Sequence, residues 1–253
     1  MTDQLSIFDT PPDDADVEPQ RTPDVEVMGP NEFYIAPFGR VVSEPLTGLH
    51  ERGIDALFKV IDKAADHTRE RSVMWTFCDL WWAALQRFEG GEERYMEIVD
   101  ELDRETLGLA TQGFAILRDH FVDRGYMSDL LGAVFMRCRS EWGGGWADQE
   151  FTPWAVCRMK ARMAVEDMEA ERLESGPAYT VCDPACGSGS LLLALRAQVA
   201  KKWGRRALAY VQCYGQDIDH LCVTMTRIQL TMSNVPWMLS LLSATVAEMR
   251  RSE

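Results

Sequence analysis

The sequence predicts an α/β fold with a small parallel sheet, preceded by a helical domain and a disordered N-terminal tail. Three observations predict it. Residues 178–195 follow the order strand, acid, glycine turn, helix, and residues 209–219 form a second apolar run that ends in an acid. Between residues 46 and 141, apolar side chains recur at helical spacing. Open α/β sheets bind nucleotides at the carboxyl end of the first strand, so the glycine turn is the expected ligand site.

The N-terminal segment, residues 1–30, is acidic and rich in proline. It holds eight acids, one arginine and five of the eleven prolines, a net charge of −7. Such a composition buries too little apolar surface to offset its ordering entropy, so we expect disorder. One short run within it resembles the peptide by which bacterial replication and repair proteins dock on the sliding clamp: Gln4, Leu5, Ser6, Ile7 and Phe8. The alternative is an inert tail.

Residues 31–145 are expected to form a helical domain. Breaks near Gly90 and Arg104 divide this region, and the tryptophans and phenylalanines at helical spacing are interpreted as core. Gly143–Gly145 lies between Trp142 and Trp146, which indicates either a lid over the ligand site or a plain linker. The predicted helices cover 47–66, 70–88, 92–102, 105–124 and 127–140.

The glycine turn follows a predicted strand at residues 178–182. Asp183 precedes Gly187 and Gly189, and an apolar helix begins near Leu191. A dinucleotide fingerprint needs a third glycine where this chain has Leu192. The acid before the glycines offers a carboxylate to an amine, and the helix N-terminus offers amides to an anion. That pairing suits a zwitterionic amino-acid group better than a pyrophosphate.

Segments on both sides of the turn support a ligand site. Thr152 and Pro153 suit the N-cap and first position of a helix predicted from Trp154 to about Ala170. Downstream, a strand at 209–214 is followed by Asp217, in the position where α/β folds hold ribose hydroxyls. Asp219 is expected to cap the next helix, over residues 221–232.

The string from Asp183 to Gly189 closely resembles the S-adenosylmethionine motif of N6-adenine DNA methyltransferases. The nearest likeness is to type I restriction modification subunits and phage-type N-6 DNA methylases, over roughly residues 125–240. It implies a Rossmann-like core in a domain covering 146–253, with S-adenosylmethionine as cofactor and DNA as substrate. In the family, Asp183 would bind the cofactor amino group and Asp217 the ribose. The implied cofactor residues are Phe151, Thr152, Pro153, Asp183, Pro184, Ala185, Cys186, Gly187, Gly189 and Asp217.

The segment that grips the target adenine in this family is not found. Family members use Asp, Asn or Ser, then two prolines and an aromatic residue, to hold a flipped base. The nearest match is Asn234, Pro236 and Trp237, with Val235 in place of the first proline. It comes 17 residues after Asp217, and we interpret it as the turn into a third strand at 237–242.

Residues 176–253 can supply about three strands, fewer than a complete methyltransferase sheet contains. We expect a methyltransferase half completed by another chain, a shortened enzyme, or a catalytically inactive relative. The inactive relative would act as a cofactor-binding or clamp-recruited protein.

The net charge and the cysteine content limit which other functions the chain can have. A net charge of −14 matches DNA poorly, so DNA contact is expected through a local basic face or a partner. The seven cysteines show no metal-ligand spacing, which favours reduced thiols, no metal and a cytoplasmic protein. We also expect no membrane span or secretion signal.

Overall fold

The structure, a computed structural model, describes residues 46–87, 91–123, 125, 127–142, 150–169 and 179–249, together with short strands at 5–6, 34–35 and 41–42. For the three short strands, residues 46–49, residue 123 and residues 235–249, the description is limited to the backbone. Most of the predicted tail, the glycine-rich segment 143–149, and Gln4, Ile7 and Phe8 lie outside the described residues.

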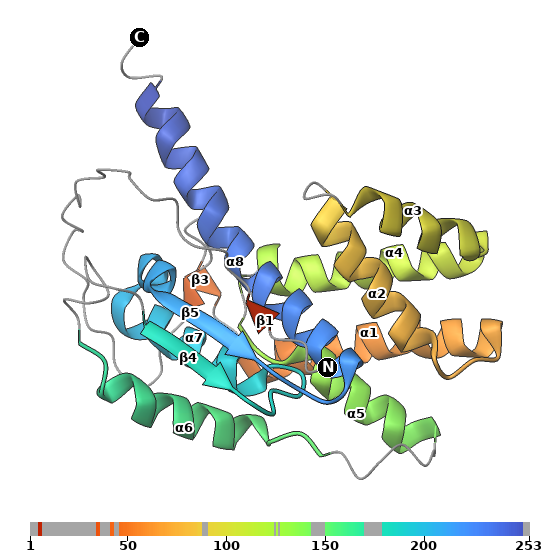
Figure 1. Ribbon diagram of the computed structural model, residues 1–253, viewed down its shortest axis with the longest axis horizontal. Helices are drawn as coiled ribbons and strands as arrows, with labels where there is room; N and C mark the ends of the chain where they lie inside the picture. Colours follow the sequence, from red (N-terminus) through yellow and green to blue (C-terminus); the bar gives the residue numbers. More distant parts are fainter. Residues whose placement is uncertain are drawn as a thin grey trace.

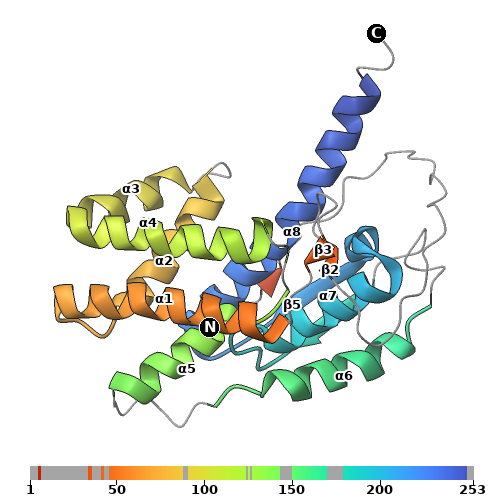
Figure 2. The ribbon, with the colours of Figure 1, turned by 180° about the vertical axis from the view of Figure 1, so that it is seen from behind.

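Five helices form the first part of the described chain (Figures 1 and 2). Their ends fall within a few residues of the predicted ones. Leu57 and Ile61, one turn apart, are fully buried, as the apolar spacing predicts. A single π-helical turn, η2 (Asp119–Asp123), extends the fourth helix. The helices are α1 (Leu46–Thr68), α2 (Val73–Gln86), α3 (Glu92–Glu101), α4 (Arg104–Arg118) and α5 (Leu130–Trp142).

Helix α6 (Trp154–Glu166) starts where the sequence places it, but its cap differs. Pro153, with an extended ψ of 137°, occupies the N-cap position, and its carbonyl accepts from the Val156 and Cys157 amides. The prediction that Thr152 caps this helix is therefore wrong. A proline that cannot donate a backbone hydrogen bond suits the helix end whether it lies at the cap or one residue later.

Two parallel strands carry the glycine turn. β4 (Tyr179–Asp183) pairs in parallel with β5 (Val211–Gly215), so that Asp183 lies opposite Gly215 at the shared carboxyl edge. The connection consists of α7 (Ser190–Trp203) and a 3₁₀ segment, η4 (Arg205–Tyr210). Helix α6 lies alongside α7 (Figure 1). The two predicted strands and their crossover helix are confirmed.

The third strand of this sheet comes from the N-terminal segment. β1 (Leu5–Ser6) pairs antiparallel with β5, so the strand order is β1-β5-β4. These two residues form an edge strand, and the disorder expected for residues 1–30 stays a prediction. A separate two-stranded pair joins β2 (Tyr34–Ile35) to β3 (Val41–Val42). The described chain is thus mostly helical with a small parallel sheet, and the Rossmann-like core remains a prediction.

The predicted third strand is wrong, because its residues belong to helix α8 (His220–Met249). The backbone is helical through residues 234–237 and 237–242, where the sequence predicts a turn and then a strand. Short apolar runs fit a buried strand and a buried helix equally well, so periodicity does not separate them here. The helix is buried on nearly all sides from Leu221 to Asn234 because it packs against α2, α5, α7 and η2.

One hydrophobic core spans the helices and the sheet. Buried side chains from α1, α5, α7 and α8 belong to a single continuous cluster, which includes Leu57, Leu130, Leu193 and Met225. The proposed domain boundary near residue 146 is thus crossed by shared packing. In the part of the chain described, no helix combines the length and the apolar character needed to cross a bilayer.

Candidate cofactor site

The glycine turn adopts a backbone that requires glycine. Gly187 has φ +54° and Gly189 has φ +91°, both in the left-handed region. A Cβ on Gly187 would lie 3.1 Å from the Phe151 ring, and one on Gly189 would lie 3.0 Å from the Thr226 side chain. The turn is therefore closely covered by Phe151 on one side and by α8 on the other, and it leads directly into the N-terminus of α7.

Asp183 has one satisfied and one unsatisfied carboxylate oxygen. Its Oδ1 accepts a hydrogen bond from the Ala185 amide at 3.2 Å. Its Oδ2 is buried and has no hydrogen-bond partner among the described residues. A buried acceptor without a donor costs free energy, so such an atom calls for a specific explanation. A donor on a bound ligand, such as an ammonium group, provides one.

The acid at the end of the second strand ties the two loops together. Asp217 Oδ2 accepts from the Gly187 amide at 2.9 Å, and its Oδ1 accepts from the Asp219 amide at 2.9 Å. The backbones are joined as well, because the Gln216 amide donates to the Asp183 carbonyl at 2.9 Å. Asp219 Oδ1 accepts from the Leu221 amide at 2.9 Å, which confirms its predicted role as a helix cap.

The Phe151 segment closes one side of the site. The Phe151 ring stacks on Phe135 of α5, with ring centres 5.5 Å apart and planes inclined by 29°. Thr152 and Pro153, like Pro184 and Ala185 of the turn, are exposed. The structure thus brings Phe151, separated by more than 30 residues from the turn in sequence, directly against Gly187.

Cys186 is a packing residue of the turn. It is buried beneath Gly215, where an added Cβ would lie 3.1 Å from the Cys186 sulfur. Burial raises the pKa of the Cys186 thiol to about 11, and the carboxylates of Asp217 and Asp183 act in the same direction. The thiol is therefore neutral at physiological pH and poorly suited to act as a nucleophile. Within the described ranges, no group of three or more His, Cys, Asp or Glu side chains could hold a metal ion.

Two buried polar residues outside the predicted set contact the turn. Asp129, just before α5, accepts from the Ser188 hydroxyl at 2.6 Å. Gln229 of α8 donates to the Ser188 carbonyl at 2.7 Å and to Asp129 Oδ1 at 2.9 Å. The sequence offers one signal for Asp129, an acid in the first turn of the helix predicted over 127–140. It offers none for Gln229, whose partners lie far away in the chain.

The site is acidic. The carboxylates of Asp129, Asp183 and Asp217 come from three elements and gather around one turn. Lys201 and Lys202 belong to α7 but lie at its other end, about 16 Å along the helix axis from Ser190. This arrangement favours a cationic ligand over a pyrophosphate.

Asn234 lies away from the glycine turn. It is buried in α8, and its Oδ1 accepts a hydrogen bond from Arg196 of α7. It lies five residues beyond Gln229, about 7.5 Å along the helix axis. The structure thus does not bring Asn234 together with the predicted cofactor residues. The side chains of Pro236 and Trp237 lie outside the described residues.

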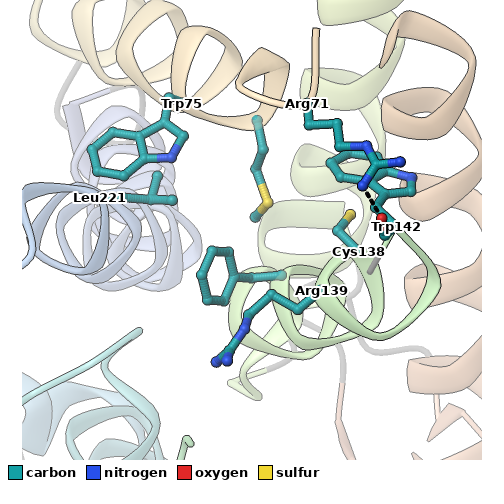
Figure 3. A pocket seen from close by; sticks show the side chains of 8 residues that line it. Arg71, Trp75, Cys138, Arg139, Trp142 and Leu221 are labelled. Carbon is teal, nitrogen blue, oxygen red and sulfur yellow. Dashed lines mark hydrogen bonds between the residues drawn. The ribbon is translucent and has the colours of Figure 1, made fainter. Parts of the chain in front are cut away.

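A small pocket lies between α2, α5 and the start of α8 (Figure 3). Trp75 and Leu221 line one side, and Arg71 donates to the Trp142 carbonyl on the other. Its interior volume of about 20 Å³ holds about one water molecule, so a nucleobase does not fit in this conformation. The remaining lining residues are Met74, Phe135, Cys138 and Arg139.

A left-handed glycine turn at a helix N-terminus, with acids closing two parallel strands, is the arrangement at which open α/β sheets bind ligands. Comparison with known proteins supports a family assignment. Residues 128–240 match the N-6 DNA Methylase family. The chain is also 33% identical over 87 residues to the type I restriction enzyme MpnII methylase subunit of Mycoplasma pneumoniae. That alignment covers 34% of this chain and 14% of the relative, and no solved structure matches significantly.

Proposed function

We propose that this chain binds S-adenosylmethionine at the glycine turn and serves N6-adenine methylation of DNA, alone or with a partner subunit. The observation that carries the proposal is the buried Oδ2 of Asp183 beside the left-handed turn, which has no hydrogen-bond partner in the part of the chain that the structure describes. An ammonium donor would satisfy that atom, and the free amides at the start of α7 suit a carboxylate. An amino-acid group offers both.

The other site residues fit the rest of such a cofactor. Asp217 has the position and chemistry to accept hydrogen bonds from ribose hydroxyls, in exchange for its bond to the Gly187 amide. Phe151 supplies an apolar cover over the turn. Three carboxylates favour a ligand that carries a positive sulfonium. When bound, S-adenosylmethionine supplies an electrophilic methyl group, and the protein's residues orient it and exclude water.

We infer that the base-gripping segment is supplied in trans. Asn234, the nearest candidate in this chain, is engaged with Arg196 in the core rather than facing the turn. A partner that carries the adenine-binding segment would complete the site, in keeping with the relative's designation as a subunit. A weaker alternative keeps Asn234, Pro236 and Trp237 as the catalytic segment, which would require α8 to rearrange.

A local basic face is available for DNA phosphates. From Pro184 to Gln216 the chain holds five Lys or Arg and no acid, and of the five only Arg196 is buried in the core. Arg158, Lys160 and Arg162 are exposed on α6, which packs along α7. Lys201, Lys202 and Arg206 are exposed at the far end of the same pair. Charge reversal of Arg158 and Arg162 to Glu should weaken DNA binding and flatten its salt dependence, because phosphate contacts release counterions.

Calorimetry with S-adenosylmethionine tests the cofactor proposal. The wild type should bind and Asp183→Ala should not, while Asp100→Ala, which removes an exposed carboxylate of α3, should bind like the wild type. Absence of binding by the folded wild type would refute the proposal. Transfer of labelled methyl groups to adenine-containing DNA, with and without proteins encoded nearby, then separates a complete enzyme from one half of it.

A non-catalytic role is the second candidate, and the engagement of Asn234 with Arg196 favours it. Cofactor binding without methyl transfer under any condition would support this role. Recruitment through Gln4 to Phe8 belongs to the same candidate. The edge-strand pairing of Leu5 and Ser6 with β5 would have to open for clamp docking. Deleting residues 1–10 should abolish capture by the sliding clamp, and unchanged capture would exclude this mode.

A further inference from the structure

We propose that Asp129 is a positioning residue for the glycine turn. With Gln229 it holds the turn in its ligand-binding shape from beneath, without touching the ligand. The inference rests on the proposed cofactor site, since the turn it positions is that site. It concerns residues that lie 59 and 41 positions from Ser188 in the sequence.

The Asp129 carboxylate is fully used by four donors. Its Oδ1 accepts from the Gly132 amide at 2.8 Å and from Gln229 Nε2 at 2.9 Å. Its Oδ2 accepts from the hydroxyls of Ser188, at 2.6 Å, and Ser190. A carboxylate offers about four acceptor positions, so none remains free. Asp129 thereby connects the first turn of α5 to the glycine turn and to the first residue of α7.

The Gln229 side-chain amide is equally saturated. Its Oε1 accepts from the Leu130 and Leu131 amides at 2.8 and 2.9 Å, and its Nε2 donates to Asp129 and to the Ser188 carbonyl. The side chain is completely buried. A buried polar network in which every group is satisfied fixes one geometry, because any displacement leaves a donor or acceptor unpaired.

Two helix N-termini point toward this one carboxylate. Asp129 caps α5, whose first residue is Leu130, and its Oδ2 also binds Ser190, the first residue of α7. The positive ends of both helix dipoles stabilise the buried negative charge. The helix dipoles and the four donors therefore offset the negative charge of Asp129. The same carboxylate joins the start of α7 to the start of α5 through hydrogen bonds.

The network binds the turn's carbonyls and hydroxyls and none of its amides. The amides of Ala185, Cys186 and Gly187 bind Asp183, the Gln216 carbonyl and Asp217 instead. The Ser188 carbonyl accepts from Gln229, and the Gly187 carbonyl accepts from Thr226 Oγ1 at 2.9 Å. Thr226 and Gln229 lie three residues apart on one face of α8. With its carbonyls held from beneath, the turn faces outward with the Gly187 amide, which binds Asp217 here.

The test compares two aspartates that each cap a helix. Asp129→Asn removes the charge and two of the acceptor positions. Asp103→Asn makes the same change at the N-cap of α4, where Asp103 Oδ1 accepts hydrogen bonds from the Glu105 and Thr106 amides. Hydrogen exchange of the ligand-free proteins should be faster over residues 183–190 in Asp129→Asn alone. Affinity for S-adenosylmethionine and for S-adenosylhomocysteine should fall at least tenfold in that variant and stay unchanged in Asp103→Asn.

Ser188→Ala provides a second variant that removes the hydrogen bond from the Ser188 hydroxyl to Asp129 while keeping the cap of α5. It should give the same local increase in exchange as Asp129→Asn. Unchanged exchange at residues 183–190 in both variants would overturn the inference. So would a uniform increase throughout the protein, which a merely stabilising role predicts. If the wild type fails to bind the cofactor but exchange at the turn still rises, the proposed function fails and the positioning role stands.

Discussion

At the scale of single residues, Asp183 faces opposite demands from stability and from binding. Its Oδ2 is buried, and no described residue donates a hydrogen bond to it, which costs free energy in the ligand-free protein. Asp183→Asn removes the charge from that position. We expect this variant to be at least as resistant to urea as the wild type while losing affinity for S-adenosylmethionine. An unfolding midpoint clearly below that of the wild type would show that a partner already stabilises the carboxylate.

Two helical glycines provide a matched pair. A Cβ on Gly132 of α5 would lie 2.2 Å from the Ser188 hydroxyl and 2.3 Å from Asp129 Oδ2, whereas one on Gly108 of α4 would meet nothing within 4 Å. Gly132→Ala should therefore destabilise the protein by about 1–3 kcal/mol through overpacking. Gly108→Ala should stabilise it by about 1 kcal/mol, because alanine is the better helix former. Thermal unfolding of both variants measures whether the change in stability has opposite sign at the two positions. Equal changes would contradict the close contacts that a Cβ on Gly132 would make.

The sequence predicts the residues that form the turn but not the residues that hold it. Asp183, Gly187 and Asp217 are recognisable because their residue types and local spacing carry the chemistry. The contacts of Asp129 and Gln229 join positions 100 residues apart, and a buried glutamine on an apolar helix has no local signature. Long-range polar pairing of this kind becomes visible only when the packing of α5, α7 and α8 is known.

At the scale of elements, the starts of the helices were predicted to within a few residues, whereas the cap of α6 and the end of α8 were not. Helix α4 starts one residue before its predicted start and has an aspartate cap, Asp103. Hydrogen bonds from Thr106 and Glu105 hold the pKa of the Asp103 carboxyl well below its ordinary value. A lowered folded-state pKa adds stability above the unfolded pKa, near 3.9, and that stability is lost as the pH falls toward the folded value.

Asp103→Asn should thus be less stable than the wild type at neutral pH. The difference should shrink as the pH falls from about 4 toward the folded-state pKa, because the unfolded wild type then binds a proton that the folded protein does not. Urea unfolding across this range measures it. A difference that stays constant with pH would mean that the cap acts through the shape of the side chain rather than through its charge.

Helix α8 shows where element prediction failed and why. The residues from Trp237 to Leu242 are apolar and were assigned to a strand, but the backbone continues the helix from His220. The buried stretch before it, Leu221 to Asn234, is surrounded by α2, α5, α7 and η2, so it lacks the polar face by which a surface helix is recognised. Whether such an apolar run forms a strand or a helix is decided by its tertiary contacts, which a short stretch of sequence does not contain.

At the scale of the whole molecule, the single core predicts a single unfolding transition. The buried cluster includes Cys78 of α2 and Cys213 of β5, on either side of the predicted boundary at residue 146. Both thiols should therefore become accessible to a labelling reagent at the same urea concentration, as mass spectrometry resolves by site. Labelling of Cys213 while Cys78 is still protected would instead establish two independently stable domains.

The network around Asp129 also limits how this site can be inherited or transplanted. The string from Asp183 to Ser190 is continuous, but the groups that give it its shape arrive from the starts of two helices and the middle of a third. Transferring residues 183–190 alone to another scaffold would transfer the recognisable motif without the side chains that hydrogen-bond to it. Recombination between relatives should preserve binding only where its crossover points keep α5, the turn and α8 from the same parent.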